Sequence, residues 1–233
     1  MEKRVVITGV GAITPIGNSV KELQEGIESN KCGIDKISLF DTSTFKTSLA
    51  AEVKNYNELD YFDAKQVKRL DRVSQFAIIA AREAVNDSGI NKENTNYDNV
   101  GVFVSSGIGG LGTIQKQCEV NYIKGNSRVS PMFIPMSISN MPAGNISIEF
   151  GFKGESTCNV TACASSTQSI GEAYKTIKHG YEEVIISGGT ESSICPVGIA
   201  GFENMKALCL SDDKNRVSIP FDKERSGFVM GEG

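Results

Sequence analysis

Residues 156–189 read STCNVTACASSTQSIGEAYKTIKHGYEEVIISGG, and this stretch decides the class of fold. Its first part, Ser156 to Thr161, is strand-like, and Cys163 follows at a turn. From Ser166 to Lys178 the apolar residues recur at helical spacing, and Val184 to Ile186 reads as a short buried strand. A helix between two strands predicts a β-α-β unit with parallel strands.

The rest of the chain repeats this alternation. Arg4 to Thr8 reads as a buried strand, Asp63 to Ser88 as one long helix, and Val100 to Val104 as the next buried strand. The weaker patterns predict helices over Val20 to Asn30, over Thr113 to Ile123 and up to Phe150, a loop over Ser130 to Met141, and short strand-like pieces such as Ser48 to Val53. The alternation predicts an α/β fold with a mostly parallel core sheet.

Composition excludes several classes of protein. The 233 residues are 39% hydrophobic and 22% charged, which suits one globular domain. The net charge of −4 gives no general attraction to nucleic acid or membrane surfaces, and no apolar run approaches the roughly 20 residues of a membrane helix. The six cysteines form no Cys-x-x-Cys pair, and His179 is the single histidine. We therefore expect free thiols in a reducing cytoplasm and neither a disulfide framework nor a zinc site.

Cys163 is the candidate for chemistry because it separates a strand from the first turn of a helix. Free N–H groups and the positive end of a helix dipole favour a thiolate at such a position. A backbone N–H of the turn can also stabilise the oxyanion that forms when a thiolate attacks a thioester. A small buried residue that happens to be cysteine fits the pattern equally well, so geometry alone leaves both interpretations open.

Five separated motifs carry a resemblance to a known family. In chain order they are Val5-Val-Ile-Thr-Gly-Val-Gly, Ser106-Gly-Ile-Gly-Gly-Leu-Gly, Ser130-Pro-Met-Phe-Ile-Pro with Asn140-Met141, Asn159 through Tyr174, and Phe221-Asp-Lys-Glu-Arg-Ser-Gly-Phe-Val-Met-Gly-Glu-Gly. Over its whole length the chain resembles the β-ketoacyl-acyl-carrier-protein synthases of type II fatty acid synthesis, and most closely the synthase II type. Ser166 is a departure, because many members of this family have glycine there.

The resemblance implies a thiolase-like fold, usually in a homodimer, with residues 1–233 as the N-terminal half of its α-β-α-β-α layers. It implies that Cys163 takes an acyl group from acyl carrier protein, and that malonyl-carrier protein then loses carbon dioxide and attacks this acyl-enzyme. The expected enzyme is a 3-oxoacyl-[acyl-carrier-protein] synthase, an acyltransferase that needs no cofactor and extends the acyl chain by two carbons.

The chain itself is expected to be inactive alone. Two family histidines assist decarboxylation, and both belong to motifs beyond residue 233. On a continuous helix His179 would lie roughly 20 Å from Cys163, too far to replace them. Phe228 to Met230 also reads as the start of a strand, which predicts that the C-terminal half is missing from this sequence.

The resemblance also assigns residues around the nucleophile. Ile108, Phe133 and Phe202 match residues that line the acyl pocket, with Phe133 reaching in from the partner subunit. The positions that match the carrier-docking patch are Lys65, Lys68, Arg69 and Lys206, with a weaker assignment for Arg72. Clustered positive charge on an otherwise acidic enzyme suits a strongly acidic carrier protein. Ordinary core packing and a solvated helix face are the alternatives for the two sets.

Other functions fit parts of the sequence. Gly107 to Gly112 formally matches a dinucleotide-binding motif, but the acidic residue expected about 20 residues on is missing. A polyketide ketosynthase would share the fold and the nucleophile and differ in its acyl substrate. A chain-length-factor-like partner would keep the fold without catalysis, although such partners usually lack the cysteine. A cysteine hydrolase needs a nearby histidine, which this chain does not supply.

Overall fold

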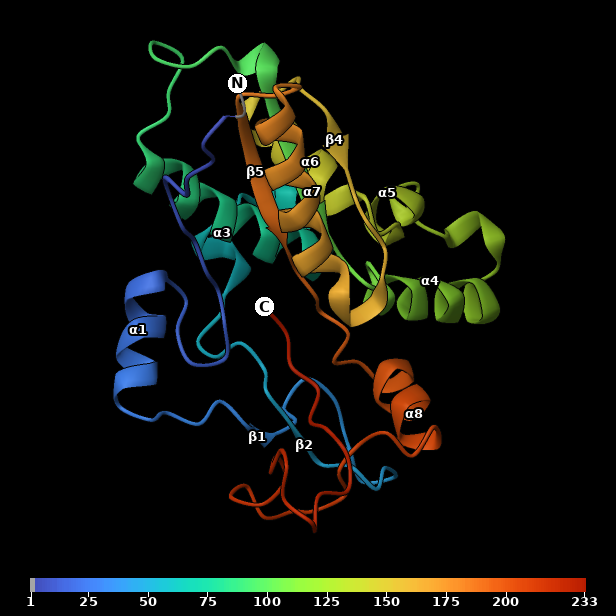
Figure 1. Cartoon of the computed structure of the whole chain (residues 1–233). Helices are drawn as coiled ribbons and strands as arrows, with labels where there is room; N and C mark the ends of the chain where they lie inside the picture. The colour runs from blue at the N-terminus through green and yellow to red at the C-terminus, as the bar shows by residue number, and fades with distance from the viewer. Residues whose placement is uncertain (1–2) are drawn as a thin grey trace.

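The computed structural model describes residues 3–233, and its centre is a three-stranded parallel sheet (Figure 1). The strand order is β4 (Ser156–Thr157), β3 (Val100–Ser105), β5 (Val184–Gly189). β3 and β5 pair along their whole length, whereas β4 pairs with β3 at Ser156 and Thr157 alone. Parallel pairing of strands that are distant in sequence confirms the predicted β-α-β organisation.

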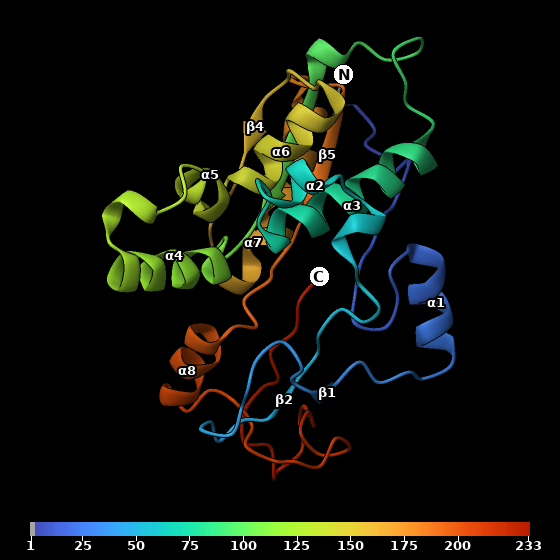
Figure 2. The same cartoon turned by 180° about the vertical axis from the view of Figure 1, so that it is seen from behind.

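Helices cover both faces of this sheet (Figures 1 and 2). α7 (Ser165–His179) packs on β3 and β5 from one side. α3 (Arg72–Ser88) and α6 (Met141–Phe150) pack on each other and on the opposite side. Every residue of β3 is buried as a result, as expected for a continuous apolar strand in a parallel sheet with two covered faces. The predicted α/β class is confirmed.

Local sequence signals set the ends of α3. The Asp71 carboxylate accepts a hydrogen bond from the Val73 N–H at the start of the helix. Gly89 follows the last turn with φ 70°, a left-handed conformation that glycine adopts without steric cost. Between them Phe76 is fully buried in the main core, together with side chains from β3 and α6. Burial of a side chain of this size stabilises the fold by roughly 2–3 kcal/mol.

The remaining elements surround these layers or form a second part of the molecule. This second part, at the bottom of Figure 1, contains two short strands, the helix Pro196–Asn204 and the chain that follows this helix. The helices and strands are α1 (Val20–Glu28), β1 (Asp35–Lys36), β2 (Leu49–Ala50), α2 (Ala64–Val67), α4 (Leu111–Lys124), α5 (Phe133–Ser137) and α8 (Pro196–Asn204). Short 3-10 turns lie at Glu58–Asp60, Tyr97–Asn99, Asn126–Arg128 and Ala162–Ala164. Within residues 3–233, no helix has both the length and the apolar character that crossing a membrane requires.

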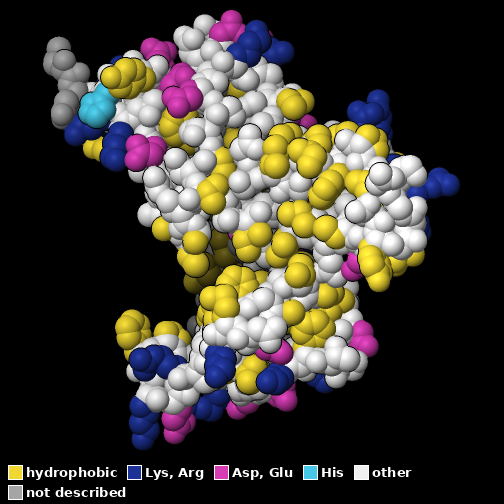
Figure 3. All heavy atoms as spheres, turned by 90° about the vertical axis from the view of Figure 1, so that its right-hand side faces the viewer, with side chains coloured by type: hydrophobic (Ala, Val, Ile, Leu, Met, Phe, Trp, Pro, Cys, Tyr) yellow, Lys and Arg dark blue, Asp and Glu magenta, His cyan; other side chains and the backbone are white. Residues whose placement is uncertain are grey.

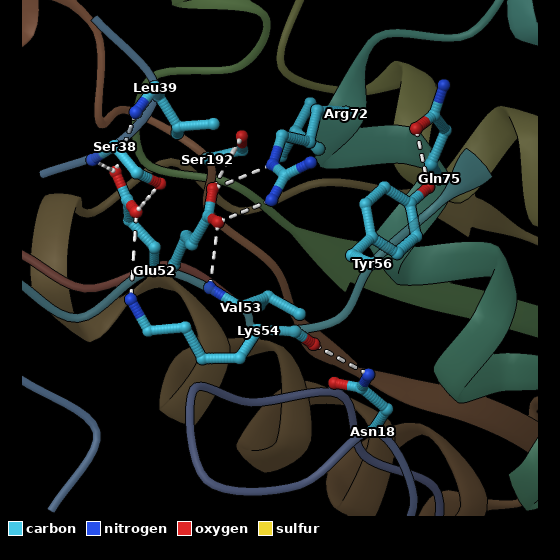
Figure 4. A network of polar contacts seen from close by, with 12 residues as sticks. Asn18, Ser38, Leu39, Glu52, Val53, Lys54, Tyr56, Arg72, Gln75 and Ser192 are labelled. Atoms are coloured by element: carbon cyan, nitrogen blue, oxygen red, sulfur yellow. Dashed lines mark hydrogen bonds and ion pairs between the residues drawn. The ribbon is translucent and has the colours of Figure 1, made fainter.

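Two buried carboxylates hold this second part of the molecule, and one of them, Glu232, also connects it to α3 (Figure 4). Glu52 is 2% exposed and accepts hydrogen bonds from the N–H and the hydroxyl of Ser38. Glu232 accepts two hydrogen bonds from the Arg72 guanidinium and one from the Val53 N–H. Because a buried charge is costly unless it is paired, these contacts tie the last residues of the chain to the start of α3.

The prediction of an N-terminal strand is wrong. Arg4 to Thr8 forms no strand in the structure, and Val6 and Ile7 are 58% and 84% exposed. The next residues are held by α3 instead, where the Val10 N–H donates to the Asp87 carboxylate at 2.9 Å. An apolar run becomes a strand only where another strand offers its backbone, and that condition is tertiary.

Two expected boundaries also differ. The single helix predicted over Asp63 to Ser88 is two helices, α2 and α3, because Asp63 and Asp71 each cap a separate helix start. The loop predicted over Ser130 to Met141 contains α5. Pro135 is tolerated there because it lies in the first turn, where its missing N–H costs no hydrogen bond.

Candidate active site

Cys163 lies in the 3-10 turn Ala162–Ala164, which follows β4 and leads directly into α7. Its side chain is exposed. The predicted placement between a strand and a helix start is therefore confirmed, and the alternative of a small buried cysteine is wrong. The thiol is open to a substrate and lies beside the positive end of the α7 dipole.

The backbone immediately before this thiol is strained. Ala162 has φ +51°, in the left-handed region that residues with a Cβ normally avoid. Such strain persists only where the surroundings hold it, and it collects at functional sites. Among the backbone hydrogen bonds of residues 3–233, none uses the N–H of Cys163, so a free donor accompanies the exposed sulfur.

Side-chain hydroxyls hold the turn from both ends. The Ser165 hydroxyl accepts a hydrogen bond from the Thr161 N–H at 2.9 Å and donates one to the Ala162 carbonyl at 2.7 Å. Upstream, the Asn159 N–H donates to the Ser105 hydroxyl at 2.8 Å. Because the Asn159 N–H bonds to this side chain, it makes no backbone hydrogen bond to β3. β4 therefore ends at Thr157, before the predicted end at Thr161.

The glycine-rich loop after β3 packs against the same turn. A Cβ added to Gly107 would lie 3.3 Å from the Ala162 carbonyl oxygen, so this loop and the turn are in close contact. The Glu191 carboxylate fixes the loop by accepting hydrogen bonds from the Gly107 N–H at 2.9 Å and the Ser106 hydroxyl at 3.1 Å. Ile108, an expected pocket residue, directly follows Gly107 in this loop and is 37% exposed.

The other two expected pocket residues come from separate helices. Phe133 is the first residue of α5 and is partly buried. Phe202 lies in α8 and makes an edge-to-face contact with Phe228, with ring centroids 5.5 Å apart. Both helices pack on α4. Their role at an acyl pocket stays a prediction.

Apolar side chains gather on the face of the molecule that carries α4, α5 and α8 (Figure 3). They surround a recess between the upper layers and the second part of the chain. Exposed apolar residues come from each neighbouring element: Ile134 and Ile138 from α5 and the segment after it, Val160 from the turn before Cys163, and Val197 from α8. A continuous apolar surface of this kind usually binds a partner or a ligand.

The structure separates the basic residues into two groups. Lys65, Lys68, Arg69 and Lys206 are exposed, as a docking patch requires. Arg72 instead forms a bidentate pair with Glu232 and lies 4.7 Å from the ring centroids of both Tyr56 and Phe76. These contacts agree with the weaker assignment of Arg72 to the docking patch, because its guanidinium is paired with a carboxylate inside the molecule.

His179 is the last residue of α7 and is exposed beside Tyr181. Because α7 is continuous from Ser165, the imidazole lies about 20 Å from the start of the helix. The expectation that it cannot serve Cys163 within one chain agrees with this geometry.

Environment also separates Cys163 from other thiols. Cys209 is buried, and burial raises the pKa of the Cys195 thiol. Cys32 and Cys118 are exposed, but Cys32 lies in a loop and Cys118 in the middle of α4. Cys163 alone combines exposure with a position at the start of a helix.

Three residues that hold the site escaped the sequence analysis: Ser105, Ser165 and Glu191. A signal existed for Ser165, because a serine in the first turn of a helix commonly bonds to nearby backbone groups. Ser105 and Glu191 contact the turn and its loop across 54 and 84 residues of sequence, and no local pattern reveals such contacts.

These features define an α/β protein that presents an exposed cysteine at the junction of a parallel sheet and a helix. The model of the family "Beta-ketoacyl synthase, N-terminal domain" matches residues 2–233. The chain belongs to this β-ketoacyl synthase family, and its fold is thiolase-like.

Curated relatives and solved structures agree with this membership. The chain is 47% identical over 231 residues to 3-oxoacyl-[acyl-carrier-protein] synthase 2 of Staphylococcus aureus (strain N315), covering 99% of this chain and 56% of the relative. It is 43% identical to the synthase 2 of Synechocystis sp., covering 100% and 56%. The chain thus spans about half the length of the curated relatives it matches.

Among solved structures, the ishigamide ketosynthase/chain length factor superposes with a TM-score of 0.87 at 29% identity, covering 100% of this chain and 57% of the other. A β-ketoacyl synthase from Burkholderia phymatum superposes with a TM-score of 0.84 at 26% identity, covering 99% and 57%. A complex of a type II polyketide acyl-carrier protein with its ketosynthase gives a TM-score of 0.76 at 25% identity, covering 90% and 58%.

Proposed function

We propose that the whole protein is a 3-oxoacyl-[acyl-carrier-protein] synthase of type II fatty acid synthesis, with residues 1–233 as its N-terminal thiolase-like domain. One observation carries the proposal: Cys163 is exposed at a strained turn that opens directly into α7. Relatives named 3-oxoacyl-[acyl-carrier-protein] synthase 2, at 43–47% identity across nearly all of this chain, support the choice of reaction.

In the first half-reaction the Cys163 sulfur attacks the thioester carbonyl of acyl-carrier protein. The free N–H of the turn stabilises the oxyanion of the tetrahedral intermediate. The carbon–sulfur bond to the carrier then breaks, the carrier thiol leaves with the proton, and the acyl group remains on Cys163.

In the second half-reaction malonyl-carrier protein loses carbon dioxide. The electron pair of the broken carbon–carbon bond attacks the acyl-Cys163 carbonyl, and the cysteine sulfur leaves. The product is a 3-oxoacyl group, two carbons longer, on the carrier. The family histidines that assist this step lie outside residues 1–233, so we expect the chain alone to carry out no condensation.

The surroundings of Cys163 fit a substrate with a long apolar part and an acidic carrier. The loop of Ile108 touches the turn, and we assign Phe133 and Phe202 to the same acyl pocket. Lys65, Lys68, Arg69 and Lys206 are exposed and available for the carrier. A similar ketosynthase has been solved with its own acyl-carrier protein, which supports this type of partner.

We also propose that the protein is a cytoplasmic homodimer. In the described residues β4 pairs with β3 on one side only, and an open sheet edge beside exposed apolar side chains favours pairing with a second copy. The six cysteines are free thiols, which suits a reducing compartment.

The test is acylation of the full-length protein. Incubation with acyl-carrier protein should add one acyl group to Cys163, detected by intact-mass and peptide mass spectrometry, and Cys163→Ala should abolish both acylation and condensation. Cys118→Ala is the matched control, because Cys118 is an exposed thiol outside the site. Acylation of a different cysteine, or none in a full-length protein that is folded, would refute the assignment.

A polyketide ketosynthase is the second candidate, because two of the structural neighbours are named for ishigamide or polyketide systems. Their identities of 25–29% are well below the 43–47% of the fatty acid relatives. Product analysis distinguishes the two functions. One 3-oxoacyl product per condensation, reduced before the next round, supports fatty acid synthesis, whereas unreduced poly-β-keto chains support the alternative.

A further inference from the structure

The strained residue Ala162 raises the question of what prevents the turn from relaxing. A residue with a Cβ prefers negative φ, so a turn with φ +51° at this position reverts unless other contacts hold it. Cys163 lies in this turn and carries both the exposed sulfur and the free N–H, so the directions of both groups depend on the shape of this short segment. The contacts that hold the strain therefore also set the geometry of the nucleophile.

We propose that Ser165 is the positioning residue that holds the Cys163 turn in its strained shape. This role rests on the proposed function of Cys163 as the acyl acceptor. Ser165 is 3% exposed, and its hydroxyl spans the strained residue, with one hydrogen bond to the residue before it and one to its own carbonyl. It accepts from the Thr161 N–H and donates to the Ala162 carbonyl, at 2.9 and 2.7 Å.

Only a hydroxyl meets this requirement with a side chain of serine size. It donates and accepts at one atom, whereas an alkyl group does neither and a thiol does both weakly. Both bonds lie within one turn of Cys163, so rotation of either peptide breaks one of them. The Ser165 hydroxyl thus couples the strain at Ala162 to the fixed start of α7.

The clamp has a firm base because α7 is packed on β3 and β5. One helical turn after Ser165, on the same face, Ser169 is fully buried and its hydroxyl lies 2.5 Å from that of Ser105. Ser105 in turn accepts the Asn159 N–H. The two ends of the turn are therefore held by hydroxyls anchored to one face of one helix, and Ser165 is the one that spans the strained residue.

The experiment uses the full-length protein and single-turnover transfer of an acyl group from a small acyl thioester to Cys163, which bypasses carrier docking. Ser165→Ala should slow acylation about tenfold, which corresponds to about 1.4 kcal/mol. The thioester concentration that gives half of the maximal single-turnover rate should change little, because Ser165 does not line the surface that binds the acyl chain. Ser166→Ala is the matched control, since it removes a hydroxyl at the next residue of α7, whereas the Thr161 N–H and the Ala162 carbonyl bond to the Ser165 hydroxyl.

A suppressor tests whether the strain at Ala162 causes the slow acylation. Glycine adopts positive φ without steric cost, so Ala162→Gly should restore most of the acylation rate in the Ser165→Ala background. A general loss of stability is measured separately as a lower melting temperature, and the acylation rates are compared well below that temperature, where every variant is folded. A crystal structure of Ser165→Ala should show residue 162 with negative φ.

The proposal is overturned if Ser165→Ala acylates as fast as Ser166→Ala, if Ala162→Gly gives no recovery, or if residue 162 keeps its positive φ without the hydroxyl. The last of these results is independent of the proposed function. If the wild-type protein is never acylated at Cys163, the proposed function fails. The φ of residue 162 in Ser165→Ala then still decides whether Ser165 holds the turn.

Discussion

Replacing Arg72 with methionine should destabilise the protein by about 3–4 kcal/mol. Glu232 is 1% exposed, and the guanidinium supplies two of its hydrogen bonds, at 2.6 and 2.9 Å. Removing one partner of a buried pair typically costs 3–5 kcal/mol, because the other charge remains buried. The lower part of this range applies because Arg72 is 26% exposed and water can reach the vacated space. Methionine keeps the contact with the neighbouring aromatic rings.

Arg216→Met is the matched control for this substitution. Arg216 pairs with Glu224 at 2.9 Å, but the two side chains are 47% and 64% exposed. An exposed pair of this kind contributes no more than about 1 kcal/mol. Urea unfolding should therefore show a large decrease in midpoint for Arg72→Met and a small one for Arg216→Met.

The double variant Arg72→Met/Glu232→Gln tests the electrostatic reasoning directly. Removing the orphaned charge should recover part of the lost stability, so the double variant should be more stable than Arg72→Met alone. Hydrogen exchange at the Val53 amide, which donates to Glu232, should report the same order locally. The reasoning is refuted if Arg72→Met costs no more than Arg216→Met, or if the second substitution adds its full cost to the first.

Three further outcomes are expected. Gly110→Ala should destabilise the protein by more than about 2 kcal/mol, because the new Cβ would lie 2.2 Å from a carbonyl oxygen in α5. Gly112→Ala is the control, because a Cβ added there would have no other atom within 4 Å, and it should leave the thermal stability nearly unchanged or raise it. Lys65→Glu should raise the KM for carrier-protein substrates and leave that for small thioesters unchanged, while Lys36→Glu in β1 should affect neither in steady-state assays. Hydrogen bonds from two backbone N–H groups of α2 lower the pKa of Asp63. The stability that this cap gives the folded state is therefore fully present above the ordinary aspartate pKa, and it is lost as the pH falls through the lower folded-state pKa. An NMR titration that gives an ordinary or raised pKa for Asp63 would contradict this.

The candidate site was predictable to the extent that it is local. A strand-like segment, a cysteine and a helical pattern follow one another within residues 156–178, and this order places Cys163 at a helix start whatever the rest of the chain does. Resemblance to a family then indicated the chemistry. The strain at Ala162 was not predictable, because alanine gives no sign of positive φ and the hydroxyl that holds it is recognised only from its distances.

The sequence by itself determined that most of the chain from Arg72 to Ser88 and from Ser165 to His179 is helical, that Gly89 ends α3, and that Cys163 stands at the junction of strand and helix. These properties depend on side chains a few residues apart, whose interactions form in any compact state of the chain. Tertiary structure alone decided that β3 lies between β4 and β5, that Arg4 to Thr8 pairs with no strand, and that Arg72 meets Glu232 across 160 residues. Such choices depend on which distant groups meet when the chain closes on itself, and periodicity along the chain carries no record of them.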